Sequence, residues 1–296
     1  MNMIMAKQLQ NYNVTETTSI KPMEVAQQDE LEFVRAKEVA IFSQDGEESE
    51  YNPLNKQWKG IADESNPNKV FNIVSNGYKI AQHEDVYNLI SEAIKDHGLD
   101  AEVKVDKLND GARIHGRVTF PELKFDLNGR TINMRMTFDN SYDATTGVRM
   151  IVGARCVKQG IVYYVRGTYS TFYHRHTKGL DINDITKKVE KGVKAFQEKI
   201  HQKFVEYSNE KIDKQKALDF LKSINNDAKK NNKANEIPDK YLSKIIKQAQ
   251  NANTQWDLYE ASCMVLSQDK DISVDNQRTL SVKMDSKIQA NLSKIK

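Results

Sequence analysis

The sequence predicts an α+β protein, in which an antiparallel sheet of about five strands is packed by a long helix and followed by a helical C-terminal half. In the middle of the chain, apolar and polar residues alternate, which is typical of strands with two different faces. From Asp181 onward, apolar residues recur at the three- and four-residue spacing of helices. Turn dipeptides such as Asn128-Gly129 separate the alternating segments and indicate hairpins.

The expected strands lie in AEVKVDKL, ARIHGRVTF, KFDLNGRTINMRMTFDN, GVRMIVGARCVKQG and IVYYVRGTYSTFY, with a further turn at Gly160. In the third segment one face carries Ile132, Met134 and Met136, and the other carries Asn133, Arg135 and Thr137. The first face is predicted to be buried. The second face, which holds most of the arginines, is predicted to be wet. Arg130 falls on the apolar side by this count, so it is expected at the end of the hairpin.

Helical spacing predicts a helix from Asp85 to His97, ended by Gly98. Before it, VFNIVSNGYKIAQ predicts two short strands joined at Asn76-Gly77. A long helix from Asp184 to Tyr207 is expected to lie across the apolar face of the sheet. Its apolar stripe is Ile185, Val189, Val193, Phe196, Ile200 and Phe204, and its opposite face carries Lys187, Lys188, Lys191, Lys194 and Lys199. Further helices are expected in KQKALDFLKSINND, IPDKYLSKIIKQAQN, TQWDLYEASCMVLSQ and DNQRTLSVKMDSKIQANLSKI, with KKNNKANEIP as a loop.

This pattern predicts three regions: a polar, partly flexible N-terminal arm over residues 1–66, an α+β core over 67–210 and a helical region over 211–296. Within the arm, DELEFVRAKEVAIF fits either a helix or a strand. The acidic cluster of Glu47, Glu48 and Glu50 favours a solvated loop over a metal site, because its spacing offers no closed set of ligands.

Composition favours a cytoplasmic protein. No apolar run approaches the ~20 residues that span a bilayer, and the first residues do not resemble a secretory signal. Cys156 and Cys263 are isolated in the sequence, which argues for a reducing compartment and against a disulfide framework.

Arginine is concentrated in the predicted sheet, where eight of the ten arginines lie between Arg113 and Arg175. Residues 113–178 carry a net charge of +7, residues 1–112 carry −9 and residues 179–296 carry +5. Guanidinium groups bind phosphate in a bidentate manner and stack on flat rings. This concentration makes nucleic acid the leading partner.

Aromatic residues accompany these arginines in IVYYVRGTYSTFYHR, and a positive groove with stacking rings is how proteins bind single strands. The predicted nucleic-acid site consists of Arg113, Arg117, Arg130, Arg135, Arg149, Arg155, Lys158, Tyr164, Arg166, Tyr173, Arg175, His176 and Lys178. The alternative is that about half of the aromatics Tyr163, Tyr164, Tyr169, Phe172 and Tyr173 fill the buried face of the sheet. The arginines would then pair with acidic groups of the N-terminal third.

Catalytic motifs are absent from the sequence: it has no P-loop, no GxGxxG after a strand and no nucleophile elbow. His174 and His176 share one face of a strand, but a third metal ligand at short range is missing. Asp139 and Asp143 could hold a divalent metal as a pair, although turn chemistry explains FDNSYDATTG more simply. We therefore expect no enzyme activity, no metal and no cofactor.

Four strings resemble the phage and plasmid family known as domain of unknown function 932, over about Lys69 to Asp269. They are NIVSNGYKIAQHEDVYNLI, FDNSYDATTGVRMIVGARCVKQG, FYHRHTKG before a long helix, and TQWDLYEASCMVLSQD. The resemblance implies that the family's motif residues correspond to Arg149, Arg155, Cys156, Arg175, His176 and Trp256. The family's cysteine is usually followed closely by Asn, whereas Val-Lys-Gln-Gly follows Cys156 here.

Genes of that family are common in mobile elements beside replication and recombination genes. A strand-rich middle followed by a long helix is also similar to the core of single-strand annealing proteins. The function expected from the residues and the resemblance together is therefore binding of single-stranded DNA, with annealing of complementary strands by a homo-oligomeric ring or filament. The rival expectation is a phage-encoded interaction or anti-defence oligomer in which the arginines serve protein contacts. A metal-dependent nuclease using Asp139, Asp143, His174 and His176 is a third alternative.

Overall fold

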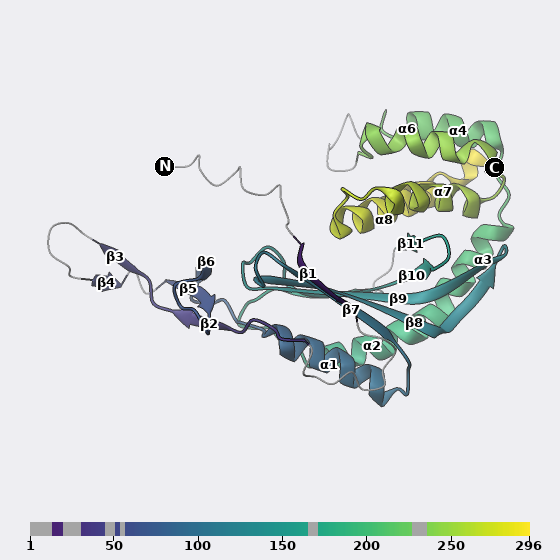
Figure 1. The fold of residues 1–296 in the computed structure, drawn as a ribbon. Coiled ribbons are helices and arrows are strands. Elements are labelled where there is room, and N and C mark those ends of the chain that lie inside the picture. Colours follow the sequence, from purple (N-terminus) through teal and green to yellow (C-terminus); the bar gives the residue numbers. More distant parts are fainter. Residues whose placement is uncertain (1–13, 20–30, 45–50, 54–56, 165–170, 227–235) are drawn as a thin grey trace. The chain divides into compact units, whose positions relative to one another are not determined.

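The structure is a computed structural model that describes residues 14–19, 31–44, 51–53, 57–164, 171–226 and 236–296 (Figure 1). The chain forms two compact units. Unit 1 comprises Met1–Thr119, Met136–Ile151 and Thr171–Glu190, and unit 2 comprises Phe120–Arg135, Val152–Ser170 and Lys191–Lys296. Among the described residues, the strands lie before Asp184 and the helices follow it, apart from one helix at His83–Asp96, so the predicted α+β class is confirmed.

The largest sheet has seven strands in the order β1-β7-β8-β9-β10-β11, with β12 also paired to β10. Its members are β1 (Val14–Ser19), β7 (Glu102–Leu108), β8 (Arg113–Leu127), β9 (Arg130–Ser141), β10 (Val148–Cys156), β11 (Ile161–Tyr163) and β12 (Thr171–His174). The predicted hairpin turn is present between β8 and β9, where Asn128 and Gly129 both have positive φ. Arg130 begins β9 directly after this turn, at the hairpin end where the alternation placed it.

Unit 1 also contains a second, three-stranded sheet formed by β2 (Ala36–Val39), β5 (Trp58–Asp63) and β6 (Val70–Ser75). Two short strands, β3 (Phe42–Gln44) and β4 (Tyr51–Pro53), pair separately. The described part of residues 1–66 therefore contains strands, and the Glu47–Glu50 cluster lies outside the described residues.

The prediction of a second strand after Asn76-Gly77 is wrong. The chain turns after β6 and then runs without strand pairing to α1 (His83–Asp96). Tyr78 explains this local structure, because its ring is buried and its hydroxyl donates to the carbonyl oxygen of Ser141 at 2.9 Å. This side-chain contact, and not hydrogen bonding to a neighbouring strand, holds the segment between β6 and α1 in position. Gly98, with φ of +61°, follows the end of α1 as predicted.

The predicted long helix is present as three consecutive segments: α2 (Asp184–Ala195), a π-helical turn η3 (Phe196–Ile200) and α3 (His201–Asn209). Val189, Phe196 and Ile200 are buried as expected, whereas Val193 is half-buried. The lysines at 187, 191 and 194 are exposed. A Cβ added to Gly192 would lie 2.5 Å from the side chain of Val152 on β10, so the helix backbone packs closely on that strand.

Unit 2 contains the predicted C-terminal helices: α4 (Lys214–Ser223), α6 (Asp239–Gln248), η5 (Ala249–Asn251), α7 (Gln255–Gln268), α8 (Val274–Ala290) and α9 (Leu292–Ile295). The side chain of Thr254 and that of Asp257 form a capping box at the start of α7. The core of this unit is aromatic, with the rings of Tyr163, Phe204 and Trp256 within 5.6 Å of one another by centroid. The expected loop KKNNKANEIP lies largely outside the described residues.

Candidate functional site

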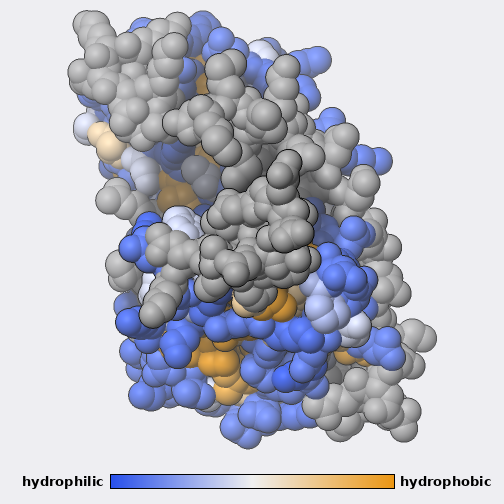
Figure 2. Space-filling model, turned by 90° about the vertical axis from the view of Figure 1, so that its left-hand side faces the viewer, coloured by the Kyte–Doolittle hydropathy of each residue, from blue (hydrophilic) through white to orange (hydrophobic). Residues whose placement is uncertain are grey.

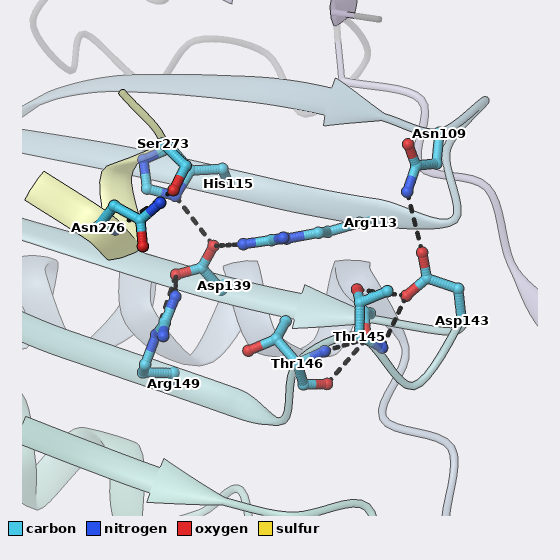
Figure 3. Close-up of polar contacts among 11 residues, drawn as sticks. Asn109, Arg113, His115, Asp139, Asp143, Thr145, Thr146, Arg149, Ser273 and Asn276 are labelled. Carbon is cyan, nitrogen blue, oxygen red and sulfur yellow. Dashed lines mark hydrogen bonds and ion pairs between the residues drawn. The ribbon is translucent and has the colours of Figure 1, made fainter. Parts of the chain in front are cut away.

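Four side chains from three neighbouring strands meet on one face of the large sheet within unit 1 (Figure 3). Oδ1 of Asp139 on β9 accepts hydrogen bonds from Nη2 of Arg113 and from Nδ1 of His115, each at 3.0 Å. Oδ2 accepts from Nε of Arg149 on β10 at 3.2 Å and from its Nη2 at 2.7 Å. We call Arg113, His115, Asp139 and Arg149 the Asp139 cluster.

Strand alternation brings these residues together. Arg113 and His115 are two apart on β8 and therefore project from the same face, while on the other face the ring of Phe138 lies where a side chain at Gly116 would be. All four members are buried, and Asp139 is 1% exposed. The cluster is thus a buried network of charged groups rather than a row of cations in water.

Electrostatics keeps the carboxylate of Asp139 ionised. Burial opposes its ionisation, but the hydrogen bond from His115 and the positive charges of Arg149 and Arg113 outweigh burial and hold the pKa of Asp139 well below its usual range. The carboxylate in turn orients the guanidinium group of Arg149, which binds one of its oxygens through two N–H groups, and it accepts one hydrogen bond from Arg113. Both arginines also make contacts beyond Asp139.

Several buried polar atoms on this face have no hydrogen-bond partner within the described part of the chain. They include Nε2 of His115, whose side chain is almost fully buried. They also include Oγ1 of Thr137, which lies two residues before Asp139 and therefore on the same face of β9. A buried polar atom without a partner is uncommon and indicates either strain or a missing ligand.

The prediction of a wet face on β9 is wrong. Met134 is 0% exposed and Arg135, on the opposite face, is 7% exposed, so both sides of the strand are covered. The alternation of faces itself is correct. The alternation of residue types does not tell whether the polar face is exposed to water. On this face Asp139 holds Arg113 and Arg149 in buried positions by charge-assisted hydrogen bonds. Among the described residues, Arg135 makes no ion pair, and its Nε lacks a hydrogen-bond partner.

The other predicted arginines are partly neutralised by acidic residues. Arg117 binds Asp106 of β7 through Nη2 at 2.6 and 2.7 Å. In unit 2, Arg130 binds Glu260 of α7 at 2.9 Å. The alternative in which the N-terminal third neutralises the sheet therefore applies to Arg117, whereas Arg113, Arg130 and Arg149 use acidic residues from the middle or the rear of the chain.

Three of the exposed predicted residues lie in β12 or just after it in unit 1. Tyr173 is 53% exposed and pairs in register with Arg149 on β10. Arg175 and Lys178 follow it and are exposed. We call Tyr173, Arg175 and Lys178 the Tyr173 edge.

The remaining predicted residues divide into buried, exposed and undescribed positions. Tyr164 is buried, so its ring is not available for stacking. His176 is buried under the ring of Tyr78, and its Nδ1 bonds the carbonyl oxygen of Lys79. Arg155 is half-buried and makes contacts of its own, and Lys158 is exposed. Arg166 and Tyr169 lie outside the described residues.

The absence of a metal site stays a prediction. The proposed pair of metal ligands, Asp139 and Asp143, is not arranged as a metal site requires. The structure shows no group of three or more His, Cys, Asp or Glu placed to hold a metal among the residues it describes. Asp139 lies within strand β9 rather than in the predicted turn, and its oxygens bind arginine. Asp143 is in a turn, where it accepts from Thr145 and from Asn109. The pairing of Asp139 with Asp143 as a metal site is therefore not formed.

Sequence reasoning missed a buried histidine at the start of α1. The ring of His83 stacks on Tyr142 with centroids 3.9 Å apart, its Nε2 donates to the carbonyl oxygen of Gly111, and its Nδ1 accepts from Asn140. Burial lowers the pKa of His83 to about 3. His115 was also missed, although its alternation with Arg113 in ARIHGRVTF placed both on one face.

The buried histidine predicts acid sensitivity. The folded protein disfavours protonation of His83, whereas the unfolded chain protonates it below about pH 6.5, so the free energy of unfolding should fall as the pH drops from about 6.5 towards 3. Burial also lowers the pKa of His176, which adds to the fall. Urea titrations between pH 7.5 and 4 should give a shallower pH dependence for His83→Gln than for the parent protein. His97→Gln, an exposed control, should keep the parent slope, and an unchanged slope in His83→Gln would contradict the assignment.

The fold and site define an α+β protein whose largest sheet carries a buried arginine–histidine–aspartate cluster on one face. The chain belongs to the family described as domain of unknown function (DUF932), whose model matches residues 70–287. No curated protein and no solved structure matches the chain. Within the part of the chain described, no helix combines the length and the apolar character needed to cross a membrane.

Proposed function

We propose that the protein binds single-stranded nucleic acid, DNA in the first place, through the Tyr173 edge. The observation that carries the proposal is the pairing of a half-exposed tyrosine with a buried, oriented arginine: Tyr173 lies opposite Arg149 in the β10–β12 ladder. A ring in this position offers a flat face to an unpaired base. The basic groups beside it offer charge to the neighbouring phosphates.

Arg175 and Lys178 supply that charge on the exposed side. Phosphate contacts fix a strand in place without reading its sequence, so the proposed binding is independent of sequence. Of the arginines that suggested nucleic acid, Arg113, Arg135 and Arg149 are buried and Arg117, Arg130 and Arg155 are half-buried, which reduces the number of phosphates that one copy contacts. This reduction strengthens the case for a homo-oligomer, because annealing requires many nucleotides to be held in order.

The first test compares two aromatic substitutions. Tyr173→Ala should weaken binding of a single-stranded oligonucleotide by about 1–3 kcal/mol, the usual contribution of one stacked base. Trp58→Ala is the matched control, because Trp58 is also 53% exposed but lies in the three-stranded sheet. Fluorescence anisotropy with single- and double-stranded oligonucleotides measures both effects. Equal affinities for the parent protein and Tyr173→Ala would contradict the proposal.

Salt dependence separates charge from stacking. Arg175→Gln and Lys178→Gln should each make the slope of log affinity against log salt shallower by about 0.7, since each removes about one phosphate contact. Tyr173→Ala should leave the slope nearly intact. Lys187→Gln, an exposed lysine on α2, is the charge control and should change neither quantity.

Annealing of complementary strands is the proposed use of this binding, because a strand-rich middle followed by a long helix is similar to the core of single-strand annealing proteins. Mixing complementary labelled strands with the protein should accelerate duplex formation above the rate without protein. Light scattering with and without oligonucleotide tests assembly into a ring or filament. Monomers under both conditions would leave binding in place and remove the annealing mechanism.

A second candidate function is protein interaction, and exposed apolar residues favour it. Trp58, Val70 and Ile73 on strands β5 and β6 are each about half exposed. On the side of the molecule drawn in Figure 2, hydrophobic areas are small and separated by hydrophilic residues. The variants Trp58→Ala and Tyr173→Ala distinguish the two candidate functions. If the protein acts by protein interaction, Trp58→Ala should weaken binding of its partner and Tyr173→Ala should leave that binding unchanged.

A further inference from the structure

We propose that a basic surface groove in unit 2 is a second binding site for single-stranded nucleic acid. The groove is lined from α4, α8 and α9, and its volume is about 550 Å³. We call it the Lys294 groove, and its lining includes Lys216, Asp219, Phe220, Ile224, Lys287 and Lys294. The inference rests on the function proposed above, because it adds a second place at which a strand is held.

The charge of the Lys294 groove is positive. Three lysines line it against a single acidic residue, Asp219, and that carboxylate is already bound at 3.1 Å by Lys222, which lies outside the lining. Positive charge is not shared by every groove of this unit, because another one, which includes Lys203 and Asp285, has two lysines and two acidic residues in its lining. A positive groove attracts the phosphates of a strand, since binding releases the counterions that surround them.

Two lysines of the groove have ammonium groups that a phosphate can reach. Lys294 is exposed, and its side chain makes no hydrogen bond or ion pair with any residue that the structure describes. Lys216 is also exposed and donates one hydrogen bond, to the carbonyl oxygen of Lys296 at 2.8 Å, whereas an ammonium group has three donors. Both lysines can therefore act as point charges towards phosphate without giving up an ion pair to a carboxylate side chain.

Hydrogen bonds between the walls hold the groove open before a ligand arrives. Nζ of Lys287 on α8 donates at 2.9 Å to the carbonyl oxygen of Ile224, the residue that caps the end of α4. The bond from Lys216 to Lys296 joins the same two walls in the opposite direction. A preformed groove loses less conformational entropy on binding. Because Lys287 makes further contacts, we assign the ligand contacts to Lys216 and Lys294.

The ring of Phe220 favours an unpaired base over other anionic ligands. Phe220 is half-buried, lines the groove and follows Lys216 by four residues on α4, so the two side chains are neighbours on one face of the helix. A base can stack on this ring while its phosphate lies beside the lysine. The bases of a duplex stack on one another, and an acidic peptide has no base, so neither ligand would use the ring. The volume lies in the range of about 300–1,000 Å³ in which proteins bind one small ligand, which corresponds to a short piece of the strand.

The first experiment measures the salt dependence of oligonucleotide binding by fluorescence anisotropy. Lys294→Gln and Lys216→Gln should each weaken binding of a single strand and make the slope of log affinity against log salt shallower by about 0.7. Lys247→Gln, which changes an exposed lysine on α6 outside the groove, is the control and should alter neither quantity. Since the Lys294 side chain makes no polar contact among the described residues, Lys294→Gln tests the site even if Lys216→Gln lowers stability.

The second experiment tests the ring. Phe220→Leu keeps an apolar side chain but removes the flat face, so it should weaken binding of a single strand about tenfold while leaving the salt slope unchanged. Phe220→Tyr keeps a ring and should bind like the parent protein. A glutamate-rich peptide serves as the competing anion. Displacement of the oligonucleotide by this peptide, together with parent affinity in Phe220→Leu, would assign the groove to an acidic protein segment and overturn the inference.

The Tyr173 edge and the Lys294 groove are distinguished by their variants. If Tyr173→Ala weakens binding while all the groove variants bind like Lys247→Gln, the function proposed above stands and the groove is not a site. If the groove variants weaken binding and Tyr173→Ala does not, the groove is a site and the Tyr173 edge is not. A parent protein that binds no oligonucleotide at low salt overturns both.

Discussion

Replacing Asp139 with asparagine should lower the free energy of unfolding by about 3–5 kcal/mol, the usual result of removing one partner from a buried ion pair. The carboxylate accepts four hydrogen bonds, two of them from Arg149, and it is 1% exposed. Asparagine keeps the shape but removes the charge and turns one acceptor into a donor. Two buried guanidinium groups then lose the anion that they share. Urea denaturation at pH 7 measures the difference.

Asp143→Asn is the matched control for this change. Asp143 lies four residues further along the same chain segment and also accepts hydrogen bonds, but it does so in a half-buried turn. Its replacement should lower the free energy of unfolding by about 1 kcal/mol. The double variant Asp139→Asn/Arg149→Met should be less destabilised than the sum of the two single changes, because removing both partners leaves less uncompensated charge. Equal losses for the two aspartate variants would show that the cluster does not stabilise the fold.

Short-range patterns in the sequence predicted most of the fold. The alternation of Ile132, Met134 and Met136 with polar residues fixed the two faces of β9, because side chains on a strand must point to opposite sides. Positive φ angles at Asn128 and Gly129 followed from the chemistry of two-residue hairpin turns. These features depend on neighbouring residues alone and therefore can be read from a single sequence.

The candidate site could be predicted only in part, because ion pairs and burial are set by residues far apart in the chain. Arg130 and Glu260 are 130 positions apart yet only 2.9 Å from one another, and no local pattern links them. A single sequence reports that Arg135 and Thr137 share a face but not that this face is covered. The same limit applies to the tyrosines: neither the burial of Tyr164 nor the exposure of Tyr173 can be inferred from IVYYVRGTYSTFY.

Replacing Phe196 with alanine should destabilise the protein by about 3–5 kcal/mol, as expected for a fully buried phenylalanine. Phe196 is 1% exposed, and its ring packs 5.4 Å from that of Phe125 on β8 by centroid. It also begins the π-helical turn, an arrangement in which the surrounding packing must compensate for the poorer helix geometry. Loss of the ring leaves a cavity and removes part of that compensation. The change in melting temperature and in the urea midpoint gives the size of the effect.

Phe220→Ala on α4 provides the comparison within unit 2, since Phe220 is half-buried and lines a surface groove. Folding buries less apolar surface at Phe220 than at Phe196. Phe220→Ala should therefore lower the free energy of unfolding by less than Phe196→Ala does, in proportion to the buried area. If Phe196→Ala melts together with the parent protein while Phe220→Ala does not, the apolar stripe of the long helix cannot lie in the core. The stripe would then be accessible in solution, and the long helix would become the first surface to examine for contacts between copies of the chain.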